Sequence, residues 1–199
     1  MASGASKMKP ELPRGRTRRP ATRKEARANQ RWRVLEAMAH QVGKNGYART
    51  TVADVIARAG VSRKAFYEHF GEKEDCFLVA YEELSNRLVN DLVAEGAPYS
   101  RGDRTGAQLG RYLAVLASDL FMARAFVVEV MAAGPRSLEL REEVNRRFAE
   151  LVFGHTSADP LVRKALIGGV NDLVTGALLR GEKDLAKLLP SMKRFVNRR

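Results

Sequence analysis

Cysteine and histidine are scarce in this chain of 199 residues, which contains one cysteine and three histidines. The single thiol, Cys76, excludes an intramolecular disulfide and a metal site built from several thiolates. His40, His69 and His155 are far apart and lack the short spacings of zinc-binding helices, so we expect no metal. We interpret Cys76 as a small buried hydrophobic residue; the alternative, a nucleophile or redox switch, lacks a neighbouring histidine and asparagine.

Long apolar runs and catalytic signatures are also missing. No stretch of about 18 residues is free of charge and glycine, and the N-terminus lacks the apolar centre of a secretory signal. We therefore expect a cytoplasmic protein without membrane contact. The sequence contains no P-loop, no dinucleotide fingerprint and no G-x-S-x-G elbow. These absences argue against an enzyme, and we expect no cofactor.

Residues 50–70 read TTVADVIARAGVSRKAFYEHF and have the pattern of two short helices joined by a glycine turn. Either Thr50 or Thr51 can cap the first helix, whose apolar residues recur at helical spacing. Gly60 tolerates a positive φ, which ends that helix and turns the chain sharply. Ser62 caps the second helix, which has the apolar stripe Ala65, Phe66 and Phe70. The pattern predicts a helix-turn-helix.

The second of these helices has an outward face of two cations, a phenol and an imidazole. Such groups suit a DNA groove, where cations and hydroxyls meet phosphates and base edges. Arg63 and Lys64 occupy the first exposed positions, which lie closest to the bases when a recognition helix enters the groove. An ordinary solvated surface is the alternative for these two residues. For His69 the alternative is a half-buried histidine satisfied by the core.

The surrounding block contains, in one uninterrupted stretch, Ala37, Gly46-Tyr47, Thr50-Thr51, Ile56-Ala57, Ala59-Gly60-Val61-Ser62, Tyr67, His69-Phe70, Lys73 and Leu78. In these residues the chain resembles the N-terminal DNA-binding domain of the TetR family of bacterial transcriptional regulators, over about residues 28 to 80. The resemblance implies that Tyr67 and His69 touch phosphates and that Thr50, Thr51 and Lys73 complete a phosphate clamp. Beyond residue 80 only the general style of the family's helical ligand-binding and dimerisation domain is shared.

Positive charge is concentrated at the N-terminus. Residues 1–33 hold eleven cations and two acids, a net of +9, which leaves +3 for the other 166 residues. This proline-broken tail cannot bury enough apolar surface to fold alone. It is either a solubilising tail or, as we prefer, an arm that contacts DNA phosphates or the minor groove. We expect DNA contacts from Thr50, Thr51, Arg63, Lys64, Ala65, Tyr67, His69 and Lys73, and from Arg16, Arg18 and Arg19 of the arm.

The periodicity predicts an all-α protein with a three-helix head and a larger helical bundle. We expect a disordered basic arm over residues 1–23, a helix-turn-helix head over 24–72 and a ligand-binding, dimerising body over 73–199. The expected helices span residues 24–44, the two short segments of the motif, 72–96, 108–116, 118–133, 137–153, 161–180 and 184–196, with a polar loop over 96–106. Pro190 is expected to begin or kink the last helix.

The segment 120–133, LFMARAFVVEVMAA, is apolar almost all round and is expected to be buried among other helices. Glu129 is the exception, and it needs either an arginine such as Arg124 or a donor from a ligand. The candidate ligand-binding residues are Tyr112, Leu116, Phe121, Met122, Phe126, Glu129 and Phe148. The same apolar residues would equally make a plain core.

Three glycines, Gly168, Gly169 and Gly176, interrupt an otherwise apolar helix. Glycine in a helix interior costs about 1 kcal/mol relative to alanine. Close approach of two helix backbones explains such a cost, so we place these glycines at a two-fold dimer interface.

Together these patterns predict a homodimeric, sequence-specific regulator, most simply a repressor, that binds a palindromic site on double-stranded DNA. A small apolar or amphipathic effector would release it by favouring a separation of the recognition helices that mismatches the grooves. The alternative is a nucleoid-type protein that coats DNA with little sequence preference and has no ligand.

Overall fold

The computed structural model describes residues 22–94, 104–154, 157 and 159–197. The described residues form helices and no strand, which confirms the predicted all-α class. The α-helices are α1 (Arg23–Asn45), α2 (Val52–Ala59), α3 (Arg63–Tyr67), α4 (Lys73–Ala94), α5 (Arg104–Ser118), α6 (Leu120–Val127), α7 (Pro135–Phe153), α8 (Pro160–Leu179) and α9 (Leu189–Asn197), with 3₁₀ turns η1 (Glu129–Ala132) and η2 (Leu185–Leu188). None of the described helices is both long enough and apolar enough to span a membrane.

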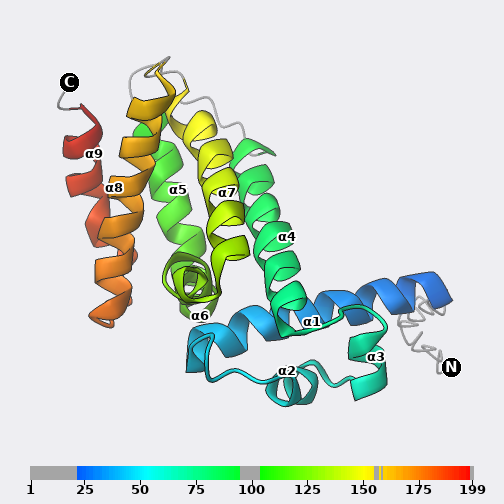
Figure 1. Cartoon of the computed structure of the whole chain (residues 1–199). Coiled ribbons are helices and arrows are strands. Elements are labelled where there is room, and N and C mark those ends of the chain that lie inside the picture. Colours follow the sequence, from blue (N-terminus) through cyan, green and yellow to red (C-terminus); the bar gives the residue numbers. More distant parts are fainter. Residues whose placement is uncertain (1–21, 95–103, 155–156, 158, 198–199) are drawn as a thin grey trace, which may run out of the picture.

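Helix α1 is the long central helix of the head. It lies across the base of the molecule, with α2 and α3 beneath it (Figure 1). It begins with a capping box, in which Thr22 accepts a hydrogen bond from the Glu25 amide at 3.2 Å and Glu25 accepts one from the Thr22 amide at 2.7 Å. It ends at Gly46, whose φ of +87° is costly for other residues. Val34, Leu35, Met38 and Val42 are buried, as expected from their spacing.

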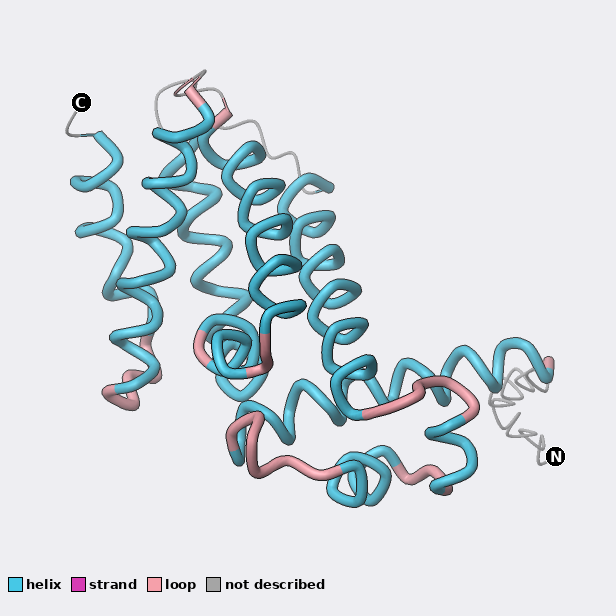
Figure 2. Tube along the Cα trace, in the orientation of Figure 1, coloured by secondary structure: helices cyan, strands magenta, loops and turns pink. Residues whose placement is uncertain are grey.

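Helix α4 leaves the head and runs along the body, where α4, α5, α7, α8 and α9 lie side by side as a bundle (Figures 1 and 2). Its first turn contains Glu74 and Asp75, which favour the positive end of the helix dipole. Within the bundle, α7 packs against α4 and α8, and α5 packs against α9.

The hydrophobic core of the head continues into the body. Cys76, Phe77 and Tyr81 of α4 belong to the same buried cluster as the apolar face of α1. So do Ala125 of α6 and Val144 of α7. The predicted boundary at residues 72–73 falls at the start of α4, but packing does not break there. Burial raises the pKa of the Cys76 thiol, which fits a small hydrophobic residue.

The backbones of α1 and α6 approach each other closely enough to exclude a side chain at Gly43. A Cβ at this position would lie 1.8 Å from the carbonyl oxygen of Phe121 and 2.8 Å from its Cα. One turn earlier on α1, the His40 ring packs against the Phe121 ring at a centroid distance of 4.5 Å. The sequence indicated no role for Gly43, because its partner is far away in the chain.

Three helix predictions were wrong in detail. The helix expected over 118–133 stops at Val127 and continues as the 3₁₀ turn η1, after a start at which Asp119 accepts a hydrogen bond from the Met122 amide at 3.0 Å. The segment expected as one last helix is divided into η2 and α9. Pro190 lies in the first turn of α9, as expected for a proline that begins this helix, and its missing N–H costs no hydrogen bond there. Helix α5 begins at Arg104, inside the expected loop, and residues 95–103 lie outside the described residues.

Replacing Gly43 with alanine is expected to lower the free energy of unfolding by about 1–3 kcal/mol, because the added methyl group meets backbone atoms that cannot rotate away. The neighbouring, exposed Lys44 provides the control, since Lys44→Ala is expected to change stability by less than about 0.5 kcal/mol. Denaturant unfolding at fixed protein concentration measures both. Equal stability of the two variants would contradict the contact between α1 and α6.

Candidate DNA-binding surface and ligand cavity

Thr51, rather than Thr50, caps α2. Its hydroxyl accepts a hydrogen bond from the Asp54 amide at 3.2 Å, and Asp54 accepts one from the Thr51 amide at 2.9 Å. The Thr51 hydroxyl and amide, as hydrogen-bond donors, lower the pKa of the Asp54 carboxyl. Thr51 stays exposed at the head surface, which is compatible with its predicted phosphate contact.

Thr50 faces inward, with 1% of its surface exposed. Its hydroxyl donates to the carbonyl oxygens of Gln41 at 3.1 Å and Gly46 at 2.9 Å. A buried hydroxyl occupied by two carbonyls cannot also reach a phosphate. The phosphate contact predicted for Thr50 was therefore wrong, and the residue anchors the chain between α1 and α2.

The turn between α2 and α3 has the predicted geometry. Gly60 adopts the left-handed conformation, with φ +63° and ψ +44°, and the Val61 amide donates to the Ile56 carbonyl at 3.2 Å. Ser62 then accepts a hydrogen bond from the Ala65 amide at 3.1 Å and starts α3. These local bonds fix the direction of α3 relative to α2.

Helix α3 presents polar side chains on one face and buries the other. Arg63 and Lys64 are exposed, and Tyr67 is 49% exposed. Phe66 is fully buried. Ala65, a member of the apolar stripe, is also buried, with 8% of its surface exposed, which argues against the DNA contact predicted for it. The three exposed side chains remain a contiguous surface of two cations and a phenol.

His69 is only partly exposed. Its Nε2 atom is buried and has no hydrogen-bond partner among the described residues. Burial, and then the cations of Arg27 and Arg31, lower the pKa of the imidazole, so the ring is neutral at pH 7. His69 is thus half-buried, but its ring is not satisfied by the core, and its phosphate contact stays a prediction.

Lys73 and Glu129 form hydrogen bonds with the two backbone polar groups of Tyr47, its carbonyl oxygen and its amide. The Lys73 ammonium donates to the Tyr47 carbonyl oxygen at 3.0 Å and lies 4.2 Å from the centre of the Tyr47 ring. The Tyr47 amide donates to the Glu129 carboxylate at 3.1 Å. Because an ammonium has three donors, Lys73 keeps donor capacity for a phosphate.

Glu129 also pairs with Arg124, whose guanidinium lies 3.3 Å from its second carboxylate oxygen. The ion pair predicted for Glu129 is therefore confirmed. The residue links the body to the head instead of facing a ligand, because η1 turns the chain toward α1 after Val127. The arm residues Arg16, Arg18 and Arg19 lie outside the described residues, and their contacts stay a prediction.

A cavity of about 50 Å³ lies between α4, α5, α6, α7 and α8. Four of the predicted ligand-binding residues line it: Tyr112, Leu116, Phe126 and Phe148. The other three do not. Phe121 is 43% exposed beside α1, Met122 packs against the core of the head, and Glu129 contacts Tyr47.

Sequence reasoning missed the polar part of this cavity. Tyr112 donates to the Asn171 amide oxygen at 3.1 Å, and Asn171 donates to the Asn145 amide oxygen at 3.1 Å. Arg141 and Tyr81 line the same cavity, as does Ser85. An amide inside the apolar run LIGGVNDLV was the available signal for Asn171.

The three glycines of α8 have different surroundings. A Cβ on Gly169 would lie 2.8 Å from the Phe195 ring of the same chain, so this glycine makes room for α9. A Cβ on Gly176 would lie 3.1 Å from the Arg180 guanidinium, which can move away. A Cβ on Gly168 would meet no atom within 4 Å. Our interpretation of Gly169 as a contact with a second subunit was wrong. Gly168 lies outward, on a face that also exposes Leu161 and Leu179 at 74% and 59%.

Comparison with known proteins identifies relatives of the head. A family model described as bacterial regulatory proteins of the tetR family matches residues 34–80. The A-factor receptor protein of Streptomyces griseus is 27% identical over 156 residues, which cover 72% of this chain and 53% of that protein. The HTH-type transcriptional regulator TtgR of Pseudomonas putida is 42% identical over 61 residues, 31% of this chain and 29% of that protein. The chain thus spans about half or less of these curated relatives.

Solved structures share the fold over most of the chain. The fatty acid degradation regulator FadR of Bacillus halodurans superposes with a TM-score of 0.72 at 19% identity, covering 84% of this chain and 94% of that one. FadR of Bacillus subtilis, solved in complex with stearoyl-CoA, superposes with a TM-score of 0.71 at 18% identity, covering 83% and 96%. At these identities the likeness concerns the fold alone.

Proposed function

We propose, from the premise that the chain belongs to the TetR family of bacterial regulatory proteins, that it is a homodimeric DNA-binding repressor controlled by a small ligand. The observation that carries this proposal is the surface of α3, where Arg63, Lys64 and Tyr67 are exposed on a helix fixed by the Gly60 turn. A rigid helix with exposed donors at its start suits the major groove.

In the proposed complex Arg63 and Lys64 read base edges, since a guanidinium forks onto guanine O6 and N7 and an ammonium reaches the same acceptors. Tyr67, Thr51 and Lys73 hold phosphates around them, and the basic arm adds contacts beside the recognition helix. A coating protein without sequence preference is disfavoured, because the match covers the helix-turn-helix of sequence-specific regulators.

The ligand would act through α6. Phe126 and Val127 of this helix line the cavity, while Phe121 on the same helix presses against Gly43 of α1. A ligand that enlarges the cavity favours a different position of α6 and therefore of the head, which is a shift between two populations. FadR of Bacillus subtilis, which shares this fold, was solved in complex with stearoyl-CoA, which supports ligand binding by a protein of this fold.

We infer that the protein is not an enzyme, since its relatives are transcriptional regulators, and that it works in the cytoplasm, where bacterial DNA lies. Within the described residues, no group of metal-binding side chains comes together.

Selection of bound sequences from a random DNA pool tests this function. The wild type is expected to select a palindromic site with half-sites about 34–36 Å apart. Arg63→Ala and Lys64→Ala should each cost roughly 1–3 kcal/mol at one base pair and change the preferred base there. Tyr67→Phe should weaken all sequences nearly alike, because it removes a phosphate contact.

The body variant Arg146→Ala is the control and should bind like the wild type, because Arg146 lies on α7, away from α3. Unchanged base preferences in both α3 variants would overturn the assignment of the recognition helix. Continuous protection of DNA without a preferred site would favour the coating alternative.

The outward face of α8 is the proposed dimer interface. Leu161 and Leu179 are the most exposed large apolar side chains of the described residues, and Phe195 of α9 is 44% exposed nearby. In a two-fold interface each substitution is present in both subunits, so its effect on the contact occurs twice. Leu179→Glu is therefore expected to give a folded monomer in sedimentation and to reduce operator affinity by about 100-fold or more.

Leu138→Glu is the matched control, because Leu138 is 43% exposed but lies on α7. It should remain a dimer of normal affinity. A dimer of wild-type stability in the Leu179 variant would place the interface on another face.

A further inference from the structure

Arg141 on α7 is a cation in the wall of the cavity, and no acid of the described residues pairs with it. It lines the cavity together with apolar side chains, and it is only partly exposed. Within the described ranges, no carboxylate lies within salt-bridge distance of its guanidinium. A partly buried guanidinium favours an anionic partner, because removal from water weakens its hydration.

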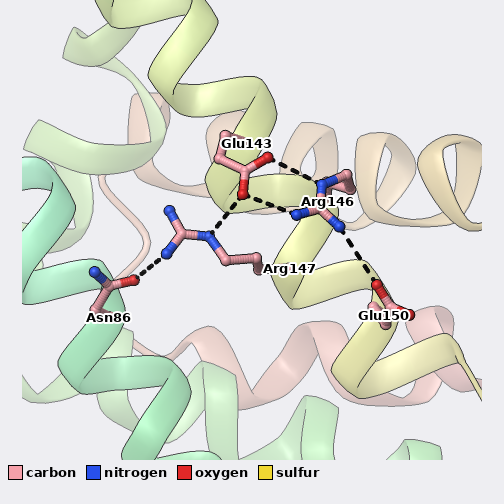
Figure 3. Close-up of polar contacts among 5 residues, drawn as sticks. All are labelled: Asn86, Glu143, Arg146, Arg147 and Glu150. Carbon is pink, nitrogen blue, oxygen red and sulfur yellow. Dashed lines mark hydrogen bonds and ion pairs between the residues drawn. The ribbon is translucent and has the colours of Figure 1, made fainter.

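The nearest acids along α7 are occupied by other cations. Glu143 binds Arg146 at 2.8 Å and lies 3.3 Å from Arg147, as Figure 3 shows. Arg146 also reaches Glu150 at 3.5 Å, and Arg147 donates to the Asn86 amide oxygen at 2.7 Å. This network ties α7 to α4 and gives both of these arginines an acidic partner on α7.

Glu142 is likewise paired, with Lys164 of α8. Of the three arginines in the run from 141 to 147, two thus form ion pairs with acids of the protein itself. The remaining one, Arg141, faces the cavity.

Polar groups surround Arg141, and one of them, the Tyr112 hydroxyl, already donates its proton to Asn171. Tyr81 and Tyr112 lie close enough for the Arg141 charge to oppose the effect of burial on their ionisation. Burial nevertheless dominates: it raises the pKa of Tyr81 to about 12 and also raises the pKa of Tyr112. Both phenols therefore stay protonated at neutral pH. The Asn145 amide lies on the same wall.

The cavity wall mixes polar and apolar side chains, and along α4 and α7 the two kinds follow one another. Along α4 the lining residues change from Tyr81 and Ser85 to Leu88 and Val89. Along α7 they change from Arg141 through Val144 and Asn145 to Phe148. Both helices start near the head and run away from it (Figure 1), so on these two helices the polar lining residues lie nearer the head than the apolar ones. Leu116 of α5 and Phe126 and Val127 of α6 add apolar side chains to the wall.

We propose that the effector of this regulator is an amphipathic carboxylate whose acid group pairs with Arg141 and whose apolar part extends toward Leu88 and Phe148. This inference rests on the proposed function, and it adds the chemical class of the ligand. A space of about 50 Å³ holds only a few water molecules. Binding of the carboxylate therefore requires the lining side chains to move apart, which couples occupancy to conformation.

Calorimetric titration of the full chain with straight-chain carboxylates from octanoate to palmitate tests the assignment. Wild-type protein should bind at least one of these acids, and the alcohol of equal length should bind about 10-fold more weakly or worse. Arg141→Gln should weaken carboxylate binding by about 10- to 100-fold, the factor for one charge-assisted hydrogen bond. The alcohol should bind this variant as it binds the wild type.

Arg146→Gln is the control, because Arg146 lies on the same helix and pairs with surface acids. It should bind carboxylate normally, and Arg141→Lys should recover part of the affinity. Circular dichroism confirms that each variant is folded. Equal affinity of Arg141→Gln and wild type for the acid, equal binding of acid and alcohol, or no binding across the series would overturn the proposal.

Two measurements, the selection of a DNA site and the binding of the acids, distinguish failure of this inference from failure of the proposed function. A protein that selects a palindromic site but binds none of the acids retains its function and refutes the carboxylate effector. A protein that binds the acid through Arg141 but selects no discrete site retains the ligand site and refutes the repressor.

Discussion

The close contact between the backbones of α1 and α6 determines how this protein is assembled. Gly43 and Phe121 meet without an intervening side chain, so the two helices cannot slide independently. Glu129 and Lys73 add polar bonds on either side of the Tyr47 peptide. Because the buried cluster of the head continues into α4, α6 and α7, the head and the lower part of the body form one packed unit.

This assembly places two kinds of chemistry at opposite sides of α6. On one side, short helices present Arg63, Lys64 and Tyr67 outward. The side-chain caps at Thr51 and Ser62 and the left-handed turn at Gly60 hold these helices in place. On the other side is a small cavity with apolar walls and a few polar groups, which suits an amphipathic molecule. The proposed regulation needs no flexible linker, because a displacement of α6 is transmitted directly to α1.

The sequence was sufficient where the determining interactions are local. The turn at Gly60 and the cap at Ser62 depend on neighbours a few residues away, so their spacing predicted them. It was insufficient where partners are distant. The bond between Glu129 and Tyr47 joins residues 82 positions apart. Arg141 drew no prediction from the sequence, and only the fold places it at the cavity. Thr50 resembled an exposed cap and is buried, since the turn after α1 covers it.

Denaturant unfolding followed by two probes tests most directly whether head and body are one unit. Trp32 of α1 is the only tryptophan in the chain and packs against the core of the head, so its fluorescence reports the head. Far-UV circular dichroism reports all the helices. At one protein concentration, the account predicts coincident transitions for the two signals. A Trp32 transition at lower denaturant, with most of the helical signal retained, would show that the head unfolds independently and would contradict the rigid connection through α1 and α6.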